Sequence, residues 1–295
     1  MKIVLIAYDH DFSLGKQRGD INGGTAWLWH LCHNFQELGH EAIMVENATP
    51  IPEADLYIIQ SEWYGTHSQP ERFEEMRKKG SKLVVILGHF KGGVYFDPNK
   101  IEADLFISTW KGEVVDSFKE EVKFLPHAYC DVCDKEGEIR KGDTVWVGNK
   151  YPLRDEYWFD GLHITRVNGL MPDELGQLYR GSTICPNIHG NFQRGVVSKE
   201  PSSLADVPGF AVNERLFHIA GSGGFQIADN NPQIREFYDE DEVICVKNGA
   251  EMKEKIEEFI KDPGKRWDYI EKAKKKTMEK HTYKQRCKQL LEWLK

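Results

Sequence analysis

The chain has 295 residues, of which 40% are hydrophobic and 29% charged, so it can build globular cores and is not broadly disordered. Its longest apolar runs, such as residues 82–87, fall far below the ~18 residues that span a bilayer. The apolar run at the start of the chain, residues 3–7, is short and is soon followed by the acidic Asp9, which is unlike a signal peptide. The sequence therefore predicts a cytoplasmic protein. With 39 Lys+Arg against 47 Asp+Glu, the net charge of −8 disfavours broad binding to nucleic-acid backbones.

Six cysteines are scattered at positions 32, 130, 133, 185, 245 and 287. This spacing predicts free thiols in a reducing compartment and no disulfide framework. His127, Cys130 and Cys133 form an H-x2-C-x2-C cluster that suits a zinc site, a redox pair or an ordinary interdomain turn. A structural zinc needs four ligands, and no second C-x2-C exists, so we predict no metal site.

The first half of the chain alternates strands with helices. A helix is expected over residues 25–38, closed by Gly39 as a C-cap. A second, charged helix covers residues 70–79. The strands around them are expected at residues 2–8, 41–46, 55–60, 82–87, 104–108 and 122–125. Such alternation is typical of a parallel, doubly wound sheet.

A charged stretch without periodicity, residues 131–143, separates this half from a second one. The second half continues with strands at 144–148, 163–168, 182–185, 224–228 and 243–246, and with helices at 173–179, 213–220 and from 251 onwards. A long irregular loop covers 187–209. We expect an N-terminal Rossmann-like domain on the acceptor side (1–130), a nucleotide-sugar-binding domain (131–280) and a C-terminal helix (281–295) that packs back on the first domain. Basic residues from Lys272 to Lys288 are interpreted as a solvated helix face.

Glycines precede a helix at Gly23-Gly24, where backbone N–H groups can approach a phosphate; a plain loop is the alternative. A second group, Gly221 to Gly224, lies between a helix and a strand. A dinucleotide fingerprint follows a strand and opens a helix, so this order is wrong for one. A nicotinamide-dependent oxidoreductase is therefore disfavoured.

Two segments carry a resemblance to a known family. Asn22-Gly23-Gly24, a helix and then Leu38-Gly39-His40-Glu41 resembles the opening of nucleotide-sugar glycosyltransferases of the GT-B fold. Residues 213–225, NERLFHIAGSGGF, resemble the donor-binding helix and glycine turn of the CgeB-like, family-1-type glycosyltransferase domain. The resemblance implies an α/β fold with two Rossmann-like domains facing a cleft. It covers nearly all of the second half, and the first half only at the level of the fold.

The resemblance also implies positions that bind the donor. Lys150 and Arg154 lie where a basic residue meets the donor diphosphate, and the guanidinium of Arg215 suits two phosphate oxygens at once. The backbone at Gly169 and Leu170 would hold the nucleobase. The remaining donor-binding positions are Asn187, Gly209, Phe210, Gly223 and Gly224, with Gly23 and Gly24 of the first half.

One position departs from the family pattern. The family usually has a glutamate after Arg-x-Phe that binds the ribose hydroxyls, and here that place is His218. A neutral imidazole accepts one hydroxyl bond, whereas a carboxylate accepts two. Either His218 holds the donor differently or the activity is altered, which leaves a non-catalytic nucleotide-binding protein as the alternative.

Polar and aromatic residues follow three predicted strands of the first half. His89 lies where related enzymes place a histidine that touches the donor sugar or steadies developing charge; a loop histidine without a role is the alternative. Glu62, Trp63 and His67 are expected on the acceptor side, or else form a packed loop. Asp9 is a candidate for the carboxylate that activates the acceptor.

These patterns predict a glycosyltransferase of the hexosyltransferase type that uses a nucleotide-diphosphate sugar, such as a UDP-sugar. The sequence does not identify the acceptor; a glycan, a small molecule, a protein and phage-type modified DNA are the alternatives, the last not favoured by the net charge. The resemblance favours retention of the anomeric configuration. Since no Asp-x-Asp metal motif is convincing, basic side chains and helix N-termini are expected to stabilise the leaving diphosphate, with no metal and no cofactor.

Overall fold

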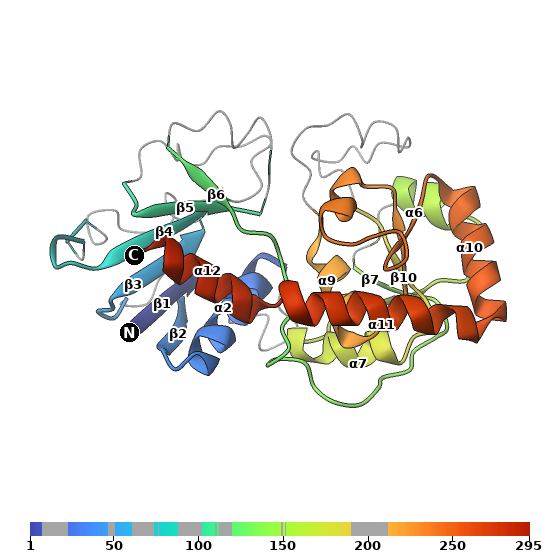
Figure 1. Ribbon diagram of the computed structural model, residues 1–295, viewed down its shortest axis with the longest axis horizontal. Helices are drawn as coiled ribbons and strands as arrows, with labels where there is room; N and C mark the ends of the chain where they lie inside the picture. Colours follow the sequence, from blue (N-terminus) through green and yellow to red (C-terminus); the bar gives the residue numbers. More distant parts are fainter. Residues whose placement is uncertain are drawn as a thin grey trace. The chain divides into compact units, whose positions relative to one another are not determined.

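The computed structural model describes residues 1–7, 23–46, 51–60, 74–75, 77–87, 102–109, 111, 120–148, 150, 152–189 and 212–295. The chain folds into two compact units (Figure 1). Unit 1 comprises Met1–Pro126 and Tyr283–Lys295, and unit 2 comprises His127–Thr282. The chain therefore crosses between the units twice, after Pro126 and after Thr282, whereas the sequence predicts these crossings after residues 130 and 280.

Unit 1 is built on a six-stranded sheet with the order β2-β1-β3-β4-β5-β6. Every pair of neighbours is parallel. The central strands are continuous apolar runs that are buried on both faces, as parallel strands covered by helices require. The strands are β1 (Lys2–Ala7), β2 (Glu41–Glu46), β3 (Leu56–Gln60), β4 (Lys82–Leu87), β5 (Leu105–Ser108) and β6 (Val122–Phe124).

Two helices distant in sequence pack together in unit 1, α2 (Gly23–Glu37) and α12 (Tyr283–Trp293) (Figure 1). The ring of Tyr283 stacks on His30 with centroids 5.0 Å apart. One turn later, the Cys287 thiol lies 3.6 Å from the carbonyl oxygen of Leu31. The last helix of the chain therefore supplies part of the core around α2.

Unit 2 contains a second set of parallel strands: β7 (Val145–Val147), β8 (Thr165–Val167), β9 (Cys185–Asn187), β10 (Gln226–Asp229) and β11 (Ile244–Val246). Strand β7 pairs with β8, and β10 pairs with both β9 and β11. A parallel bridge between Thr144 and Ile184 links the two groups. The order β8-β7-β9-β10-β11 follows, and the carboxyl ends of these strands share one edge.

Helices cover this second sheet and close its core. Trp146, Phe225 and Phe259 belong to one buried cluster that joins β7 to the helical tail. Helix α9 contacts both α7 and α11. The helices of unit 2 are α6 (Pro152–Phe159), α7 (Leu175–Arg180), α9 (Glu214–Ser222), α10 (Gly249–Lys261) and α11 (Pro263–Lys280), with the 3-10 turns η2 (Pro172–Glu174) and η3 (Pro232–Glu236).

One strand begins later than its sequence suggests. A strand was expected over residues 182–185, but β9 spans Cys185–Asn187. The N–H groups of Thr183 and Ile184 both donate to the carbonyl of Asp143 at 2.9 Å, so this turn does not pair with β10. Pairing begins where Cys185 donates to Phe225 at 2.8 Å, and Asn187 is thereby drawn into the sheet.

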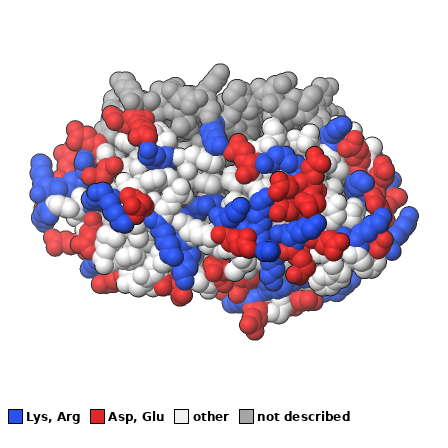
Figure 2. Space-filling view, in the orientation of Figure 1, with Lys and Arg blue, Asp and Glu red and all other residues white. Residues whose placement is uncertain are grey.

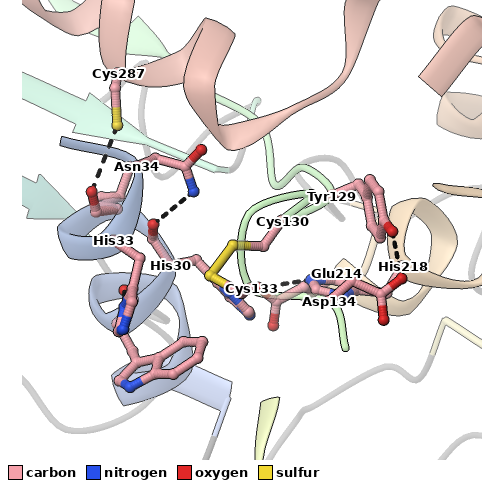
Figure 3. The surroundings of a disulfide bond; sticks show 12 residues. His30, His33, Asn34, Tyr129, Cys130, Cys133, Asp134, Glu214, His218 and Cys287 are labelled. Carbon is pink, nitrogen blue, oxygen red and sulfur yellow. Dashed lines mark hydrogen bonds and ion pairs between the residues drawn. A yellow bond between two sulfur atoms is a disulfide. The ribbon is translucent and has the colours of Figure 1, made fainter. Parts of the chain in front are cut away.

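The prediction of six free thiols is wrong for one pair. Cys130 and Cys133 form a disulfide, with their Cα atoms 5.2 Å apart (Figure 3). Both lie in one tight turn, closed where Asp134 donates to the carbonyl of Cys130 at 3.1 Å, which brings the sulfurs together. As a disulfide, the pair offers no thiolate to a zinc ion. The other four cysteines are free, and burial raises the pKa of Cys32 to about 11 and of Cys185 to about 12.

In the described part of the chain, no helix combines the length and the apolar character that crossing a membrane demands.

Candidate functional site

Several polar residues of unit 2 lie at the carboxyl edge of its sheet. Strand β7 ends before Gly148, β9 ends before Ile188 and His189, and β10 ends at Asp229. Ligands of open parallel sheets bind at this edge, because loops and helix N-termini converge there. The residues around these three strand ends are therefore the candidate site of unit 2.

Two arginines lie against one buried indole at this edge. The guanidinium carbons of Arg154 and Arg215 are 4.5 and 4.4 Å from the ring centroid of Trp146. Trp146 is fully buried and Arg154 is only 5% exposed. Both arginines thus hold their charge over an aromatic face, where cation–π attraction replaces part of the lost hydration.

The arginines at this edge differ in how they pair with carboxylates. Asp155 pairs with Arg154 at 3.0 Å and with Arg166 at 2.7 Å. Arg215 forms no ion pair with any described carboxylate. Arg154 and Arg166 thus share Asp155, whereas Arg215 lies within electrostatic reach of Asp229 and Glu214 without forming an ion pair with them.

Backbone carbonyls fix Arg215 in place. Its Nη1 donates to the carbonyl of Val147 at 2.8 Å and its Nη2 to that of Ile188 at 3.1 Å. Its Nε donates to Oδ1 of Asn187 at 3.3 Å. Burial, followed by smaller contributions that include the like charge of Arg154, lowers the pKa of Arg215 to about 10.

The start of α9 explains how Arg215 reaches these carbonyls. Asn213 is the N-cap, and its side-chain oxygen accepts the N–H of Leu216 at 3.2 Å. Its amide nitrogen donates to Asn187 at 2.9 Å, which ties the helix start to the end of β9. Arg215 follows in the first turn and is thereby directed between β7 and β9.

Gly148 is required by the same arrangement. Its φ of +137° is rarely adopted by residues with side chains, and a Cβ there would lie 2.9 Å from Nη1 of Arg215. The glycine thus lets the chain leave β7 directly beneath the guanidinium. Lys150, which follows two residues later, is exposed.

The structure brings several of the residues singled out from the sequence together. Arg154, Asn187 and Arg215 meet around Trp146 and the ends of β7 and β9. Gly169 and Leu170 follow β8 in the same unit, and Gly169 adopts a φ of +73°.

Other expected donor-binding residues lie elsewhere in unit 2. Gly223 is the left-handed C-cap of α9, and Gly224 packs against Ile219 and Tyr179. Both glycines are at the opposite end of α9 from Arg215. His218 lies in the middle of the helix, with its ring edge-on to Tyr129 at 5.8 Å and its Nε2 3.7 Å from Glu214 (Figure 3).

The remaining candidates belong to the first half of the chain or fall outside the description. Gly23 and Gly24 form the first turn of α2 in unit 1. The candidates outside the described residues are Asp9, Glu62, Trp63, His67, His89, Gly209 and Phe210.

Several side chains of the site have no sequence signal that marks them as site residues. Trp146 and Arg166 lie within short strands, where an isolated tryptophan or arginine carries no distinctive pattern. Asp155 follows Arg154 directly and resembles an ordinary helix-surface pair. His189 and Asp229 are 40 residues apart in sequence, and only the parallel pairing of β9 with β10 brings them together.

Solved structures share this architecture. Sucrose-phosphate synthase from Thermosynechococcus elongatus is 10% identical with a TM-score of 0.59, covering 99% of this chain and 98% of its own. T4 phage BGT in complex with UDP and Mn²⁺ is 11% identical with a TM-score of 0.60, covering 100% and 99%. Anabaena HepE in complex with UDP-glucose is 9% identical with a TM-score of 0.56, covering 100% and 99%. At these identities, the likeness establishes the fold.

Comparison of sequences adds the family. The sequence model described as glycosyl transferase-like matches residues 134–292, more than half of the chain. No curated protein sequence matches the chain significantly. The chain therefore belongs to the glycosyl transferase-like family, and it is a glycosyltransferase with the GT-B fold of two Rossmann-like domains.

Proposed function

We propose that the protein transfers a sugar from a nucleotide-diphosphate sugar, with UDP-sugars the first candidates, and that the donor diphosphate binds at Arg154 and Arg215. The observation that carries this proposal is the pair of guanidiniums on Trp146 at the carboxyl edge of the unit 2 sheet. Two of the structural relatives were solved with UDP or UDP-glucose, which supports a uridine donor.

Arg215 has the hydrogen-bonding capacity for this role. A guanidinium carries five N–H donors in a planar fork. Within the described residues, Arg215 uses three of them, on Val147, Ile188 and Asn187. The other two donors suit phosphate oxygens, and the three bonds already formed hold the fork rigid before the anion arrives.

The same arrangement supports a reaction without a metal ion. As the glycosidic bond to the diphosphate breaks, negative charge grows on the leaving group. Preorganised cations in a site of low dielectric stabilise that charge without reorganising. In the proposal, the three guanidiniums of Arg154, Arg166 and Arg215 supply the local positive charge, and the anomeric configuration of the sugar is retained.

The proposed acceptor is a glycan or a small molecule. The chain has a net charge of −8, so a DNA acceptor would meet overall electrostatic repulsion. An uncharged acceptor would meet none. Once the acceptor is known, NMR of the product shows whether the transferred sugar keeps the anomeric configuration that it has in the donor.

The first experiment is a thermal-shift panel over UDP-, GDP-, ADP- and dTDP-sugars, followed by a measurement of donor hydrolysis. We expect a UDP-sugar to give the largest rise in melting temperature, because binding to the folded state alone stabilises it. Slow release of UDP from that donor is expected of an enzyme. A rise in melting temperature without any release would instead identify a non-catalytic nucleotide-binding protein, and no rise with any donor would refute the site.

Removal of divalent cations tests the metal-free mechanism. With EDTA in excess, we expect UDP release or sugar transfer to keep most of its rate, since protein cations neutralise the diphosphate. The T4 phage relative was solved in complex with UDP and Mn²⁺, so adding Mn²⁺ back is the matched control. A complete loss of rate that only the added cation restores would refute this part of the proposal.

A further inference from the structure

A buried histidine–aspartate pair lies beside Arg215 and has no role in the diphosphate site. Nδ1 of His189 is 2.5 Å from Oδ1 of Asp229, and the two side chains are only 2% and 4% exposed. The backbone N–H of His189 donates to both carboxylate oxygens at 3.1 Å. Asp229 thus holds both the ring and the main chain of His189.

The other ring nitrogen of His189 has no partner. Among the described residues, its Nε2 is buried and forms no hydrogen bond. A buried polar atom without a partner costs free energy, which a bound ligand can recover. His189 belongs to the same strand end as the donor site, because Arg215 donates to the carbonyl of Ile188, the residue before it.

The contact with Asp229 decides which chemistry Nε2 offers. A carboxylate that accepts the Nδ1 proton fixes the neutral imidazole in the tautomer with a lone pair on Nε2. A lone pair needs a donor such as a hydroxyl. A diphosphate oxygen carries no proton at neutral pH, so it does not match. The hydroxyls of a nucleotide sugar lie on its ribose and on the sugar to be transferred.

We propose that Nε2 of His189 accepts a hydrogen bond from a hydroxyl of the bound nucleotide sugar, with Asp229 as the positioning residue that fixes the tautomer. This assignment rests on the proposed function, since it requires a nucleotide sugar at Arg215. His189 then selects the sugar-bearing part of the donor, while the arginines bind its diphosphate.

Binding of UDP and UDP-glucose by calorimetry tests the assignment. His189→Leu should weaken UDP-glucose binding by about tenfold. His189→Gln should stay within about threefold of the wild type, because its amide oxygen reaches the place of Nε2. A loss for UDP-glucose alone assigns the transferred sugar, and an equal loss for UDP assigns the ribose. The exposed His163→Leu is the matched control and should bind normally.

Asp229→Asn tests the tautomer with the ring in place. The amide can donate to Nδ1, which would leave a proton on Nε2, so binding should weaken about as much as in His189→Leu; this variant also decides if the leucine variant does not fold. Normal binding by His189→Leu or Asp229→Asn would overturn the proposal. Equal losses of UDP-glucose affinity in His189→Leu and His189→Gln would also overturn the proposal. The neutral glutamine can accept a hydrogen bond but carries no charge, so such a result would mean that the imidazole acts as a cation. A wild type that binds neither ligand would refute the proposed function itself.

Discussion

Unit 2 carries two concentrations of basic side chains, and their surroundings differ. At the carboxyl edge of the sheet, Arg154 and Arg215 lie on a buried indole, with one carboxylate shared between Arg154 and Arg166. On α11, Lys272 is exposed and pairs with Asp241 at 2.8 Å. Lys276 on the same helix pairs with Asp239 and Glu242. Figure 2 shows basic and acidic side chains interspersed over the described part of the face in view, which has the orientation of Figure 1.

The difference indicates which cations are available for a ligand. Lys272 and Lys276 already have carboxylate partners near the surface, so they gain little from another anion. Arg154 and Arg215 lie against a buried indole and have lost much of their hydration, and Arg215 forms no ion pair with a described carboxylate, so an incoming diphosphate would give it a charged partner. Basic residues therefore indicate an anion site by their burial and pairing, and their number alone does not.

The largest expected effect that tests this comparison is that of Arg215→Ala. The carbonyls of Val147 and Ile188 lose their donor, so the free energy of unfolding should fall by about 2–4 kcal/mol. UDP binding should weaken by about 1.5–3 kcal/mol. Lys272→Ala on α11 is the control; it should lower stability only slightly and leave UDP binding unchanged. Urea unfolding measures the stability and calorimetry measures UDP binding. Equal effects of the two substitutions would mean that the sheet edge and α11 do not differ in how they bind an anion.

Gly148→Ala should have the next largest effect. The added Cβ meets Nη1 of Arg215 and the backbone must keep a φ of +137°, so stability should fall by about 1–3 kcal/mol and UDP binding should weaken. Gly39→Ala is the matched control, because Gly39 has a φ of +83° with nothing within 4 Å of its Cβ. This control should lose stability through strain alone. If both variants bind UDP normally, the space beside Arg215 does not serve the donor.

Arg154→Lys keeps the charge and removes the planar fork. The lysine loses the stacking on Trp146 and the paired contact with Asp155, so UDP binding should weaken by about 1 kcal/mol. The reverse exchange on α11, Lys276→Arg, should leave binding unchanged. Calorimetry at one ionic strength compares the two. Unchanged binding in Arg154→Lys would mean that charge alone suffices at the sheet edge.

The smallest effect is expected from Asp241→Asn, at the carboxylate that pairs with Lys272 of α11, and it should depend on pH. The hydrogen bond from Lys272 lowers the pKa of Asp241 below its ordinary 3.8. The stabilisation is therefore complete above that value and is lost as the pH falls through the lowered pKa. The small difference in melting temperature between wild type and variant should be present near neutral pH and vanish in acid. A difference that grows in acid would contradict the pairing with Lys272.

Local patterns predicted most of the fold. Apolar runs such as residues 82–87 give β4, and Gly39 closes α2 with the left-handed conformation expected of a C-cap. The start of β9 was predicted too early, because the competing bonds of Thr183 and Ile184 to Asp143 join residues about 40 apart. The disulfide was missed because its formation depends on the turn geometry around Cys130, which spacing alone does not reveal.

The site was predicted less completely than the fold. Arg154, Asn187 and Arg215 were found through a family resemblance, and the structure places them together. Gly223 and Gly224 lie away from them, because a glycine turn can serve as a helix C-cap as well as a phosphate loop. His189 carried no motif, and its pairing with Asp229 depends on two strands whose register becomes visible only in three dimensions.

The return of α12 to unit 1 has a consequence for folding during synthesis. Domains usually fold one after another as they leave the ribosome, the N-terminal one first. Here the fully buried Tyr283 and Leu290, which complete the packing around α2, are translated after all of unit 2. Unit 2 is one continuous segment and can close first, while nascent unit 1 still exposes the apolar side of α2. The part of the chain made first is thus the part finished last, and chaperones that bind exposed apolar segments would meet it throughout translation.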